Sequence, residues 1–427
     1  MMGQQDVVAD GIGIGFGPAN IALAVVAEES AASSDLVYIE GGTSPEWQPG
    51  MLIADSDIQN SPVRDLVSLR NPRSRYTFTN YLHEEGRLLD FLNLPLEFPL
   101  RKDFAKYVKW VGETVDANVN FGARATTVRR RGDLLAVEDE DGNCRLGRSV
   151  IVGTGRALHI PDVAVPVLGE RVFHATRYLD HIDRNLSSVS TPRVLIVGAS
   201  QSGVELALDV RGRSHEAEVS IVSRGIGPRL KDTSPFTEHA YFPEFTDYYY
   251  SLASEQKRDV DAKLRNSNYS AADADVIEKL YVAIYEDSLD GHARTTLRKF
   301  TGIEKMEVVG QRVRVTFREV HTGEVHDELF DTVILATGFQ DLGPLDHQER
   351  VPRVLAAVAD ELLYDEDGYL VVSRSYQTSW ADGSPSGIFL NGLCETSHGL
   401  GDAGSFSLLS LRSETILNGI QDYLSAV

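Results

Sequence analysis

Cysteine is scarce in this chain of 427 residues, which has two, Cys144 and Cys394. They form neither a CxxC pair nor part of a metal-ligand cluster, so dithiol redox chemistry is excluded and a reducing compartment is favoured. Basic residues are also in the minority, since 41 lysines and arginines stand against 63 aspartates and glutamates and the net charge is −22. That surplus of acid has the wrong sign for a protein that binds a nucleic-acid backbone.

Long apolar runs are missing as well. No stretch of the sequence reaches the roughly 18 apolar residues that cross a bilayer, and Met1–Asp10 lacks a basic segment followed by an apolar one. We therefore expect a cytoplasmic protein with no membrane contact and no targeting signal. Its 42% hydrophobic and 24% charged residues are typical of a globular protein, and its length predicts two or three domains.

An apolar strand that runs into a glycine-rich turn and then a helix occurs twice. The first copy is GIGIGFGPAN at residues 11–20, and the second is VLIVGASQSG at residues 194–203. Missing Cβ atoms let such a turn approach a pyrophosphate at the helix N-terminus, where free N–H groups and the helix dipole favour anions. Each turn is a candidate dinucleotide site, although tight turns also use glycine for steric reasons alone. The candidate contacts are Gly13, Gly15, Gly17 and Pro18 in the first turn and Gly198, Gln201, Ser202 and Gly203 in the second.

The residues after each turn indicate which dinucleotide it binds. The strand at residues 35–40 ends in Glu40, an acid suited to adenosine ribose hydroxyls, and this favours FAD or NAD. The strand at residues 217–223 is followed by Arg224, with Arg229 nearby, and these cations suit the 2′-phosphate of NADPH. Ser200 stands where the middle glycine of the second turn is usual, and we expect it to crowd the pyrophosphate slightly.

These patterns predict an α/β fold with two Rossmann-like dinucleotide-binding domains and a small helical substrate subdomain. Two strands that end in Thr-Gly, at residues 150–155 and 332–338, are expected where the chain leaves and re-enters the first domain. The predicted boundaries are 1–165 and 330–427 for an FAD-binding domain, 166–236 and 298–329 for an inserted NADPH-binding domain, and 237–297 for the helical subdomain. Helices are expected over 254–264 and 272–285. Residues 387–391 are predicted to form a strand, residues 399–404 a loop that contains Asp402, a candidate cofactor contact, and residues 405–420 a closing helix aimed at the flavin.

Further short blocks follow one another along most of the chain. They are GFGPAN at 15–20, Trp47 with Gly50 and Met51, Gln59, DLVSLRNP at 65–72, YTFTNYL at 76–82, GRL at 86–88, SPF at 234–236, NYS at 268–270, ATG at 336–338 and HG at 398–399. In these blocks the sequence resembles the flavin-dependent N-hydroxylating monooxygenases, which hydroxylate the side-chain amine of ornithine or lysine for hydroxamate siderophores and related products. The Gly-Pro-Ala-Asn of the first turn is more similar to the ornithine branch than to the lysine and diamine branches.

The resemblance implies FAD and NADPH as cofactors, a small-molecule amine and O2 as substrates, and a homodimer or homotetramer. In this family NADPH reduces FAD, O2 adds to the reduced ring, and the C4a-hydroperoxide passes its distal oxygen to a neutral amine. The protein then supplies position and dryness more than acid–base groups. No metal is expected, which agrees with the lack of metal-ligand spacing in the sequence.

The resemblance also assigns roles to individual residues. Gln59 and Trp47 are expected beside the flavin, and Arg101, Arg224 and Ser202 at NADPH. Arg64 stands where the family usually has a lysine that binds the amino acid carboxylate. Asn268 and Ser407 are expected beside the substrate, with Ser405 and Ser410 as competitors of Ser407 because the loop differs in length by one residue. His174 and Tyr178 lie in a linker stretch and are expected to be structural.

Two departures from the family pattern concern the substrate. Glu238 and His239 stand where ornithine enzymes have asparagine and glutamate, and Gly404-Ser405-Phe406 stands where they have Thr-Leu-Leu. Glu238 is suited to an α-ammonium beside a carboxylate on Arg64, to the remote ammonium of a diamine, or to neutralising Arg64. The alternatives to an ornithine- or lysine-type substrate are therefore a diamine and an acidic amino acid such as aspartate, oxidised at its α-amine.

Other protein classes fit less well. A flavin disulfide reductase shares the two-nucleotide architecture but needs a cysteine pair that this chain lacks. A Baeyer–Villiger or sulfur-oxidising monooxygenase has a Gly-xxx-His linker, whereas residues 169–174 contain one residue more. A non-catalytic flavin-binding protein is the alternative of another class.

Overall fold

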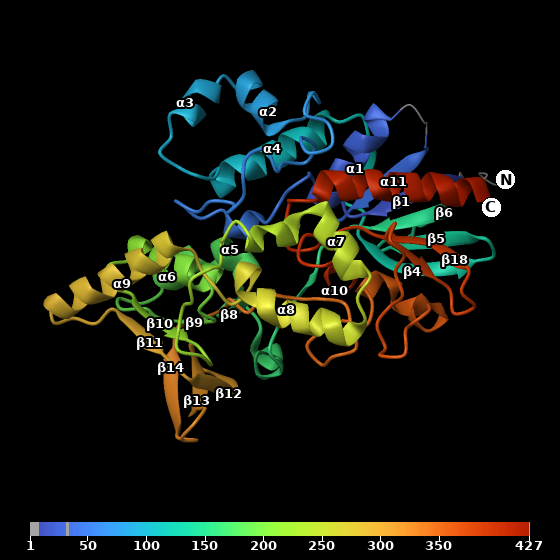
Figure 1. The fold of residues 1–427 in the computed structure, drawn as a ribbon. Coiled ribbons are helices and arrows are strands. Elements are labelled where there is room, and N and C mark those ends of the chain that lie inside the picture. Colours follow the sequence, from blue (N-terminus) through green and yellow to red (C-terminus); the bar gives the residue numbers. More distant parts are fainter. Residues whose placement is uncertain (1–7, 31–33, 427) are drawn as a thin grey trace.

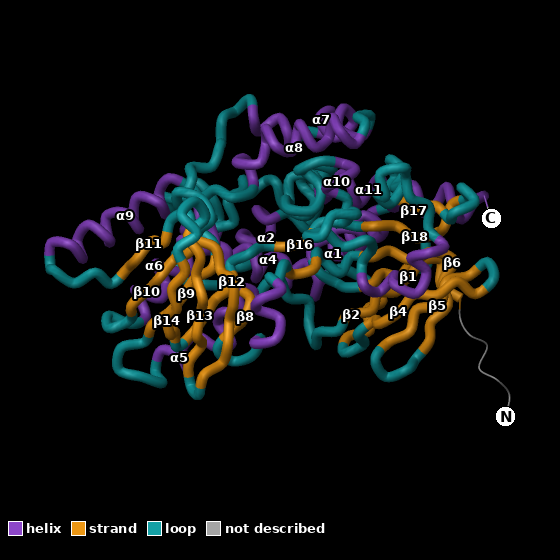
Figure 2. The backbone as a smooth tube through the Cα atoms, turned by 90° about the horizontal axis from the view of Figure 1, so that it is seen from below, coloured by secondary structure: helices purple, strands orange, loops and turns teal. Residues whose placement is uncertain are grey.

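The computed structural model describes residues 8–30 and 34–426. It contains two large sheets that lie side by side, one mixed and one all parallel (Figures 1 and 2). Residues 1–7 and 31–33 of the first predicted domain, and Val427, lie outside the described residues. The first sheet has eight strands in the described part of the chain, with the parallel order β3-β2-β1-β6-β18, β17 antiparallel at the β18 edge, and β4 and β5 beside β6. Its strands are β1 (Val8–Ile14), β2 (Leu36–Glu40), β3 (Asn118–Phe121), β4 (Ala125–Arg131), β5 (Leu134–Asp139), β6 (Cys144–Val152), β17 (Gln377–Ser379) and β18 (Pro385–Leu390).

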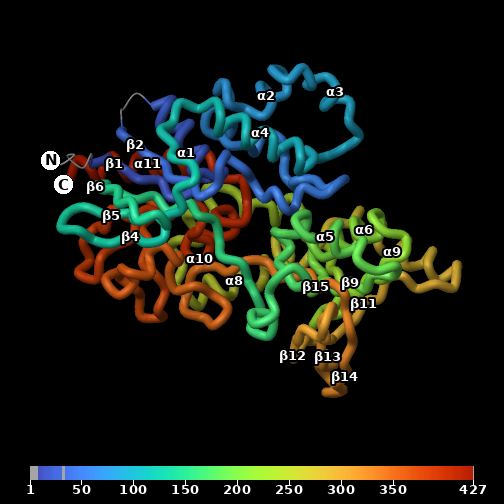
Figure 3. Tube along the Cα trace, turned by 180° about the vertical axis from the view of Figure 1, so that it is seen from behind, coloured from blue at the N-terminus to red at the C-terminus, as the bar shows by residue number. Residues whose placement is uncertain are grey.

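The second sheet has five strands among the described residues, all parallel, in the order β11-β10-β9-β15-β8. They are β8 (Val172–His174), β9 (Arg193–Val197), β10 (Glu218–Val222), β11 (Thr295–Arg298) and β15 (Thr332–Leu335). Every residue of β15 is buried, which is why its sequence is continuously apolar after Thr332. A smaller antiparallel sheet of β12 (Thr301–Val309), β13 (Arg312–Glu319) and β14 (Val325–Phe330) projects on the side opposite to the helices of residues 78–114 (Figure 3).

Helices cover both sheets, and each sheet has its own apolar core. The eight-stranded sheet with its helices is called the first unit, and the five-stranded sheet with its helices the second unit. In the first unit α11 packs against α1 and β18, and α4 packs against α1 and α2. In the second unit α6 packs against β9, β10 and the helix Ala274–Leu289, labelled α9. The bounds are α1 (Pro18–Glu29), α2 (Phe78–Glu84), α3 (Leu88–Leu92), α4 (Arg101–Thr114), α5 (Tyr178–Leu186), α6 (Gln201–Arg213) and α11 (Leu409–Ala426). None of the helices described is long and apolar enough to span a bilayer.

The predicted helical segment contains α7 (Pro243–Tyr250), α8 (Ser254–Asn268) and α9 (Ala274–Leu289) after a short 3-10 turn at Thr237–Tyr241. Helices α7 and α8 lie on one face of the molecule, over the junction of the two sheet units (Figures 1 and 2). Helix α9 instead buries Val276 and Leu280 in the core of the second unit. The α8 and α9 helices were both predicted, and each extends four residues farther at its C-terminal end than the pattern indicated.

The chain passes between the two units at two places, and these crossings lie against each other. β7 (Ala157–Leu158) pairs antiparallel with β16 (Phe339–Gln340), and the His159 N–H donates to the Gly338 carbonyl at 2.9 Å. The first Thr-Gly strand, β6, belongs to the first sheet. The second, β15, pairs with β8 and β9 in the second sheet, although the prediction assigned it to the first domain. A continuously apolar sequence such as that of β15 fits a buried strand of either sheet, so the sequence does not indicate which sheet it joins.

Asn20 holds the first glycine-rich turn together. Its side-chain amide donates to the carbonyls of Ile14 and Gly15 at 3.2 and 2.7 Å, and its oxygen accepts from the Asn391 amide at 3.1 Å. Asn20 is fully buried. A Cβ on Gly153 would lie 2.6 Å from the Asn20 amide nitrogen, so the neighbouring strand end must be glycine. The last residue of the Gly-Pro-Ala-Asn block therefore has a structural purpose.

We predict that Asn20→Ala lowers the free energy of unfolding by about 2 to 4 kcal/mol, because it leaves two buried carbonyls and the Asn391 amide with fewer partners. Urea unfolding of the full chain measures the effect. Asn93→Ala is the control, since Asn93 is exposed and its side chain has no hydrogen bond with the described residues. Equal stability of the two variants would contradict the role given to Asn20.

Candidate active site

The first glycine-rich turn leaves an open space at the start of α1. Gly15 has a φ of +83°, and a Cβ there would lie 2.8 Å from the Gly153 carbonyl oxygen. Gly17 is the N-cap of α1 and has no heavy atom within 4 Å of where its Cβ would stand. Pro18 begins the helix, where its missing N–H costs nothing. The α1 N-terminus is thus open to an anion, as a pyrophosphate requires.

Glu40 faces this turn from the end of β2. Its carboxylate accepts hydrogen bonds from the Phe16 and Gly42 backbone N–H groups at 2.7 and 2.6 Å. The prediction placed an acid here for the ribose of a dinucleotide, and the residue does lie beside the glycine-rich turn. The turn, the acid and the open helix N-terminus fit an adenine dinucleotide.

The second turn resembles the first in its positive-φ glycine and in its N-cap. Gly198 has a φ of +117° and closely approaches Ala336, and a Cβ on Gly203 would lie 2.1 Å from the Gly198 oxygen. Ser200 is the N-cap of α6 with φ −93° and ψ −171°, against −88° and −172° for Gly17 at the N-cap of α1. These are extended angles that any residue adopts, so the backbone of the turn does not require glycine at position 200.

Two predicted NADPH contacts of the second unit, Gln201 and Arg224, differ in whether their side chains are free to bind a ligand. The Gln201 side chain is occupied, because it accepts from the Asp273 N–H and donates to Glu205, both at 2.8 Å. Arg224 follows β10, is exposed, and has no ion-pair partner among the described residues. Its guanidinium is free for a phosphate, which is the role predicted for it.

A cavity of about 190 Å³ lies where the two units and the α7–α8 segment meet. It is lined by predicted residues from six separate stretches of the chain: Trp47, Gln59, Arg64, Arg101, Ser202, Glu238, Asn268 and Ser407. Ser405, a competitor of Ser407, lines the cavity as well, and Ser410 does not. Glu40, Arg224 and Asp402 lie elsewhere.

Arg64 is at the polar end of this cavity. Its guanidinium lies 3.3 Å from the Glu238 carboxylate and 3.2 Å from the Ser407 hydroxyl. Ser405 donates a further hydrogen bond to Ser407 at 2.8 Å. The Arg64 and Glu238 side chains are 25% and 30% exposed, so this is a pair in contact with solvent rather than a buried one. Of the three uses predicted for Glu238, neutralising Arg64 is the one that the structure contains.

Arg101 also lines the cavity and has a partner within the protein. At the start of α4 it forms an ion pair of 3.1 Å with Glu205 of α6, and the two side chains are 11% and 5% exposed. Burial raises the pKa of Glu205, and the charge of Arg101 opposes that rise. The sequence analysis did not identify Glu205, because nothing in the α6 pattern marks a partner that lies in another unit.

Gln59 and Asn268 enter the cavity from different units. Gln59 sits in a loop of the first unit with a φ of +52°, and its side-chain amide donates to Asp273. Asn268 is the last residue of α8, and a Cβ on Gly404 would lie 2.7 Å from its amide nitrogen. Glycine at position 404 therefore leaves room for the Asn268 side chain.

Asp402 and the HG block at 398–399 are tied into the protein. Asp402 is buried, pairs with Arg412 at 2.9 Å, and accepts from the Cys394 N–H at 2.6 Å. His398 stacks on Tyr376 with ring centroids 4.1 Å apart, and burial lowers its pKa to about 4, so its ring is neutral. Within 8–30 and 34–426 no group of three histidine, cysteine, aspartate or glutamate side chains is arranged to hold a metal ion.

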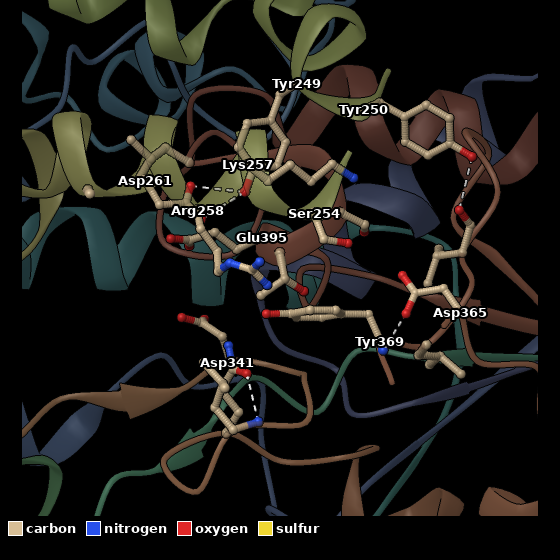
Figure 4. Close-up of a pocket in the computed structure, with 18 of the residues that line it drawn as sticks. Tyr249, Tyr250, Ser254, Lys257, Arg258, Asp261, Asp341, Asp365, Tyr369 and Glu395 are labelled. Atoms are coloured by element: carbon tan, nitrogen blue, oxygen red, sulfur yellow. Dashed lines mark hydrogen bonds between the residues drawn. The ribbon is translucent and has the colours of Figure 1, made fainter. Parts of the chain in front are cut away.

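A second, larger cavity of about 550 Å³ lies between α7–α8 and the segment 341–372 (Figure 4). Lys257 and Asp261 line it from α8, and Asp341, Tyr369 and Glu395 line it from the other side. The wall toward the first cavity contains a polar cluster that the sequence analysis missed. In this cluster Tyr269 donates to Glu395 at 2.6 Å, and Arg156 lies 2.9 Å from Asp341 and 3.6 Å from Glu395. Tyr269 belongs to the NYS block, which was the available signal.

Known proteins similar to this chain include ornithine and lysine monooxygenases. The model of a family described as L-lysine 6-monooxygenase/L-ornithine 5-monooxygenase matches residues 7–341. L-ornithine N(5)-monooxygenase from Pseudomonas aeruginosa is 31% identical, over 98% of this chain and 95% of its own length. The ornithine N-hydroxylase of Kutzneria sp. 744, solved with FADred, NADP+ and L-orn, has a TM-score of 0.90 at 29% identity, covering 97% of this chain and 99% of its own. L-lysine 6-monooxygenase from Pseudomonas syringae has a TM-score of 0.83 at 31% identity, covering 97% and 100%. The predicted α/β fold with two Rossmann-like domains is confirmed.

The polar cluster of Arg156, Tyr269, Asp341 and Glu395 should make the free energy of unfolding depend on pH. Burial raises the pKa of Glu395 to about 8, from 4.5 for a free carboxyl. Between these pH values the folded chain keeps a proton that the unfolded chain has lost, so this carboxyl makes folding less favourable as pH rises, by up to about 1.4 kcal/mol per pH unit. We expect Glu395→Gln to remove that slope, because glutamine stays neutral and its oxygen still accepts from Tyr269.

Urea unfolding at pH 5, 6, 7 and 8 measures this difference. The stability of the natural chain relative to Glu395→Gln should fall steadily from pH 5 to pH 8, whereas Glu366→Gln, at an exposed position, should follow the natural chain. Parallel pH curves for the natural chain and Glu395→Gln would contradict the prediction.

Proposed function

The chain belongs to the L-lysine 6-monooxygenase/L-ornithine 5-monooxygenase family, and we propose that it is a FAD- and NADPH-dependent monooxygenase that N-hydroxylates a primary amine of a small amino acid. The observation that carries this proposal is the cavity in which Gln59, Arg64, Asn268 and Ser407 meet from separate parts of the chain. Ornithine and lysine are the first substrates to test, because the relatives named above are ornithine and lysine enzymes.

The residues of the first unit fit FAD. In the proposed arrangement its pyrophosphate lies at the open start of α1, near Gly13, Gly15, Gly17 and Pro18, with the ribose at Glu40. Trp47 and Gln59 then belong to the flavin end, since both line the cavity. Bound FAD, once reduced by NADPH, would supply the activation of O2. Asp402 acts at most through the loop that it stabilises, because its carboxylate is occupied by Arg412 and Cys394.

The residues of the second unit fit NADPH. Gly198 and Gly203 allow the close turn at α6, Ser202 faces the cavity, and the free guanidinium of Arg224 suits a 2′-phosphate. Arg101 and Gln201 are already hydrogen-bonded to Glu205, so each would need to exchange or share that partner to hold a phosphate. The first unit is accordingly proposed as the FAD-binding domain and the second as the NADPH-binding domain.

The charges of the cavity favour a substrate that carries a carboxylate. The charged side chains that line it are Arg64, Arg101, Lys231 and Glu238, and Arg101 is neutralised by Glu205. Lys231 lies near Asp273, where its charge opposes the rise in the pKa of that carboxyl caused by burial, so Arg64 and Glu238 are the charges left for a substrate. An amino acid can place its carboxylate on Arg64 and its α-ammonium on Glu238, whereas a diamine has no anionic group for Arg64.

Ser407 completes this arrangement. Its oxygen accepts from Arg64 and from Ser405, so its own hydrogen is left to donate to a bound group. Asn268 offers a neutral amide on the other side of the cavity. Lys231 is the one observation that favours a second candidate function, oxidation of an acidic amino acid such as aspartate, because it provides a cation for a second carboxylate.

The substrate is tested with purified enzyme, FAD, NADPH and O2, by measuring hydroxylamine formed and NADPH consumed with ornithine, lysine, aspartate, putrescine and cadaverine. We expect coupled hydroxylamine with at least one amino acid and none with the two diamines. Hydroxylation of a diamine alone would contradict the carboxylate grip. NADPH oxidation that yields only hydrogen peroxide with all five would contradict the proposed substrate class.

Arg64 is tested by variants of the same enzyme. Removing a charged hydrogen bond in Arg64→Ala should raise the KM of the preferred amino acid by about tenfold to 100-fold. Arg64→Lys keeps the charge without the planar fork and should raise KM less. The flavin content and the KM for NADPH should not change. An unaltered amino acid KM in Arg64→Ala would contradict the role of this residue.

A further inference from the structure

Gln59 has a side-chain partner that lies in the other unit. Its Nε2 amide donates to the carboxylate of Asp273, which is the N-cap residue of α9. An aspartate at an N-cap usually accepts from the N–H groups of the helix that it begins, but the Asp273 side chain makes no such bond. The carboxylate is turned away from its own helix and toward Gln59.

The rest of Gln59 is held as well. Its backbone has a φ of +52° and its N–H donates to Asp57 at 2.8 Å, so the chain is fixed up to the Cα atom. The side-chain oxygen of Gln59 accepts no hydrogen bond from the described residues, and the residue lines the cavity beside Arg64 and Asn268. An ionised carboxylate can only accept, so it selects the nitrogen end of the amide. The oxygen end is thereby left for the cavity.

Asp273 is itself anchored through the second unit. Its N–H donates to Gln201, Gln201 donates to Glu205, and Glu205 pairs with Arg101 at 3.1 Å. The chain of contacts begins at Gln59 and ends at Arg101, both in the first unit, and passes through α9 and α6 of the second. A shift of the second unit would move the carboxylate that holds Gln59.

We infer that Asp273 is a positioning residue that fixes the Gln59 amide with its oxygen toward the cavity. This inference rests on the proposed function for its effect on catalysis, because Gln59 is proposed at the flavin end. The contact itself does not depend on that proposal. With the amide free to rotate, Gln59 would present donor and acceptor in turn, and a larger share of the O2 that takes up the two electrons of NADPH would leave as hydrogen peroxide without oxidising the amine.

The test compares the full-length enzyme with Asp273→Ala, Asp273→Asn, Gln59→Ala and the double variant Asp273→Ala/Gln59→Ala. Asp275→Ala is the matched control, since Asp275 lies in the first turn of the same helix and, in the part of the chain that the structure describes, pairs only with Lys279 on the surface. Two quantities are measured: hydroxylamine formed per NADPH consumed, and the Tm of the FAD-loaded enzyme without amine.

We expect Asp273→Ala to lower hydroxylamine per NADPH by about tenfold, the effect of one hydrogen bond to a charged group. Gln59→Ala should lower it equally, and the double variant no further. Asp273→Asn should restore most of the yield, because its side-chain oxygen still accepts from Gln59. Asp275→Ala should match the natural enzyme.

The Tm values test the contact apart from catalysis. Asp273→Ala should lower Tm in the natural chain and leave it unchanged in the Gln59→Ala background. Tm shifts that simply add in the double variant would overturn the inference. It would also be overturned if Asp273→Ala formed as much hydroxylamine per NADPH as the natural enzyme while Gln59→Ala formed much less. If no variant forms hydroxylamine from any amine but the Tm shifts are non-additive, the contact is upheld and the proposed function fails.

Discussion

The buried ion pair between Arg101 and Glu205 is the contact on which the geometry of the cavity depends. It joins the start of α4 in the first unit to α6 in the second, with side chains 11% and 5% exposed. Two charges buried to this extent are stable only together, since losing one leaves the other uncompensated. From Glu205 the contacts continue through Gln201 and Asp273 to Gln59. The cavity therefore lies between two units whose spacing is set by a pair that cannot easily be broken.

The ion pair between Arg64 and Glu238 has the opposite character. Arg64 and Glu238 are 25% and 30% exposed and 3.3 Å apart, and pairs of this kind contribute little to stability. A weak pair can be replaced by a ligand at small cost, because each charge finds an opposite charge on the incoming molecule. A zwitterionic amino acid offers both charges on one carbon atom. The same protein thus uses ion pairs in two ways: a buried one joins the units, and a partly exposed one neutralises the cavity, where under the proposed function a substrate amino acid would replace it.

Most of the elements could be predicted because they follow from periodicity and from turns. The glycine-rich turns, α8, α9, the strand that ends at Glu40 and the strand that precedes Arg224 lie where the pattern indicated. The cavity residues were found because they stand in short blocks that resemble a family, although those blocks give no contacts. Asp273, Glu205 and Glu395 were not found, since each has its meaning only through a partner in another part of the fold. For the same reason the sheet that contains β15 could not be read from its apolar run, and the start of the closing helix was placed four residues early, because Ser405 caps a turn before it.

Most of the departures from the family pattern line the cavity. They are Arg64, Glu238, Gly404, Ser405 and Phe406, whereas Ser200, the departure in the second glycine-rich turn, keeps the N-cap backbone angles of Gly17 in the first. Position 404 explains part of this grouping. A Cβ there would lie 2.7 Å from the Asn268 amide nitrogen and 2.9 Å from the Tyr269 hydroxyl, so any larger residue would displace both. Tyr269 in turn donates to Glu395, and Arg156 lies against both. Glycine at 404, the position of Asn268 and the buried cluster behind it are therefore one packing solution. A change of substrate in this chain must be sought in that group of residues rather than at the cofactor end.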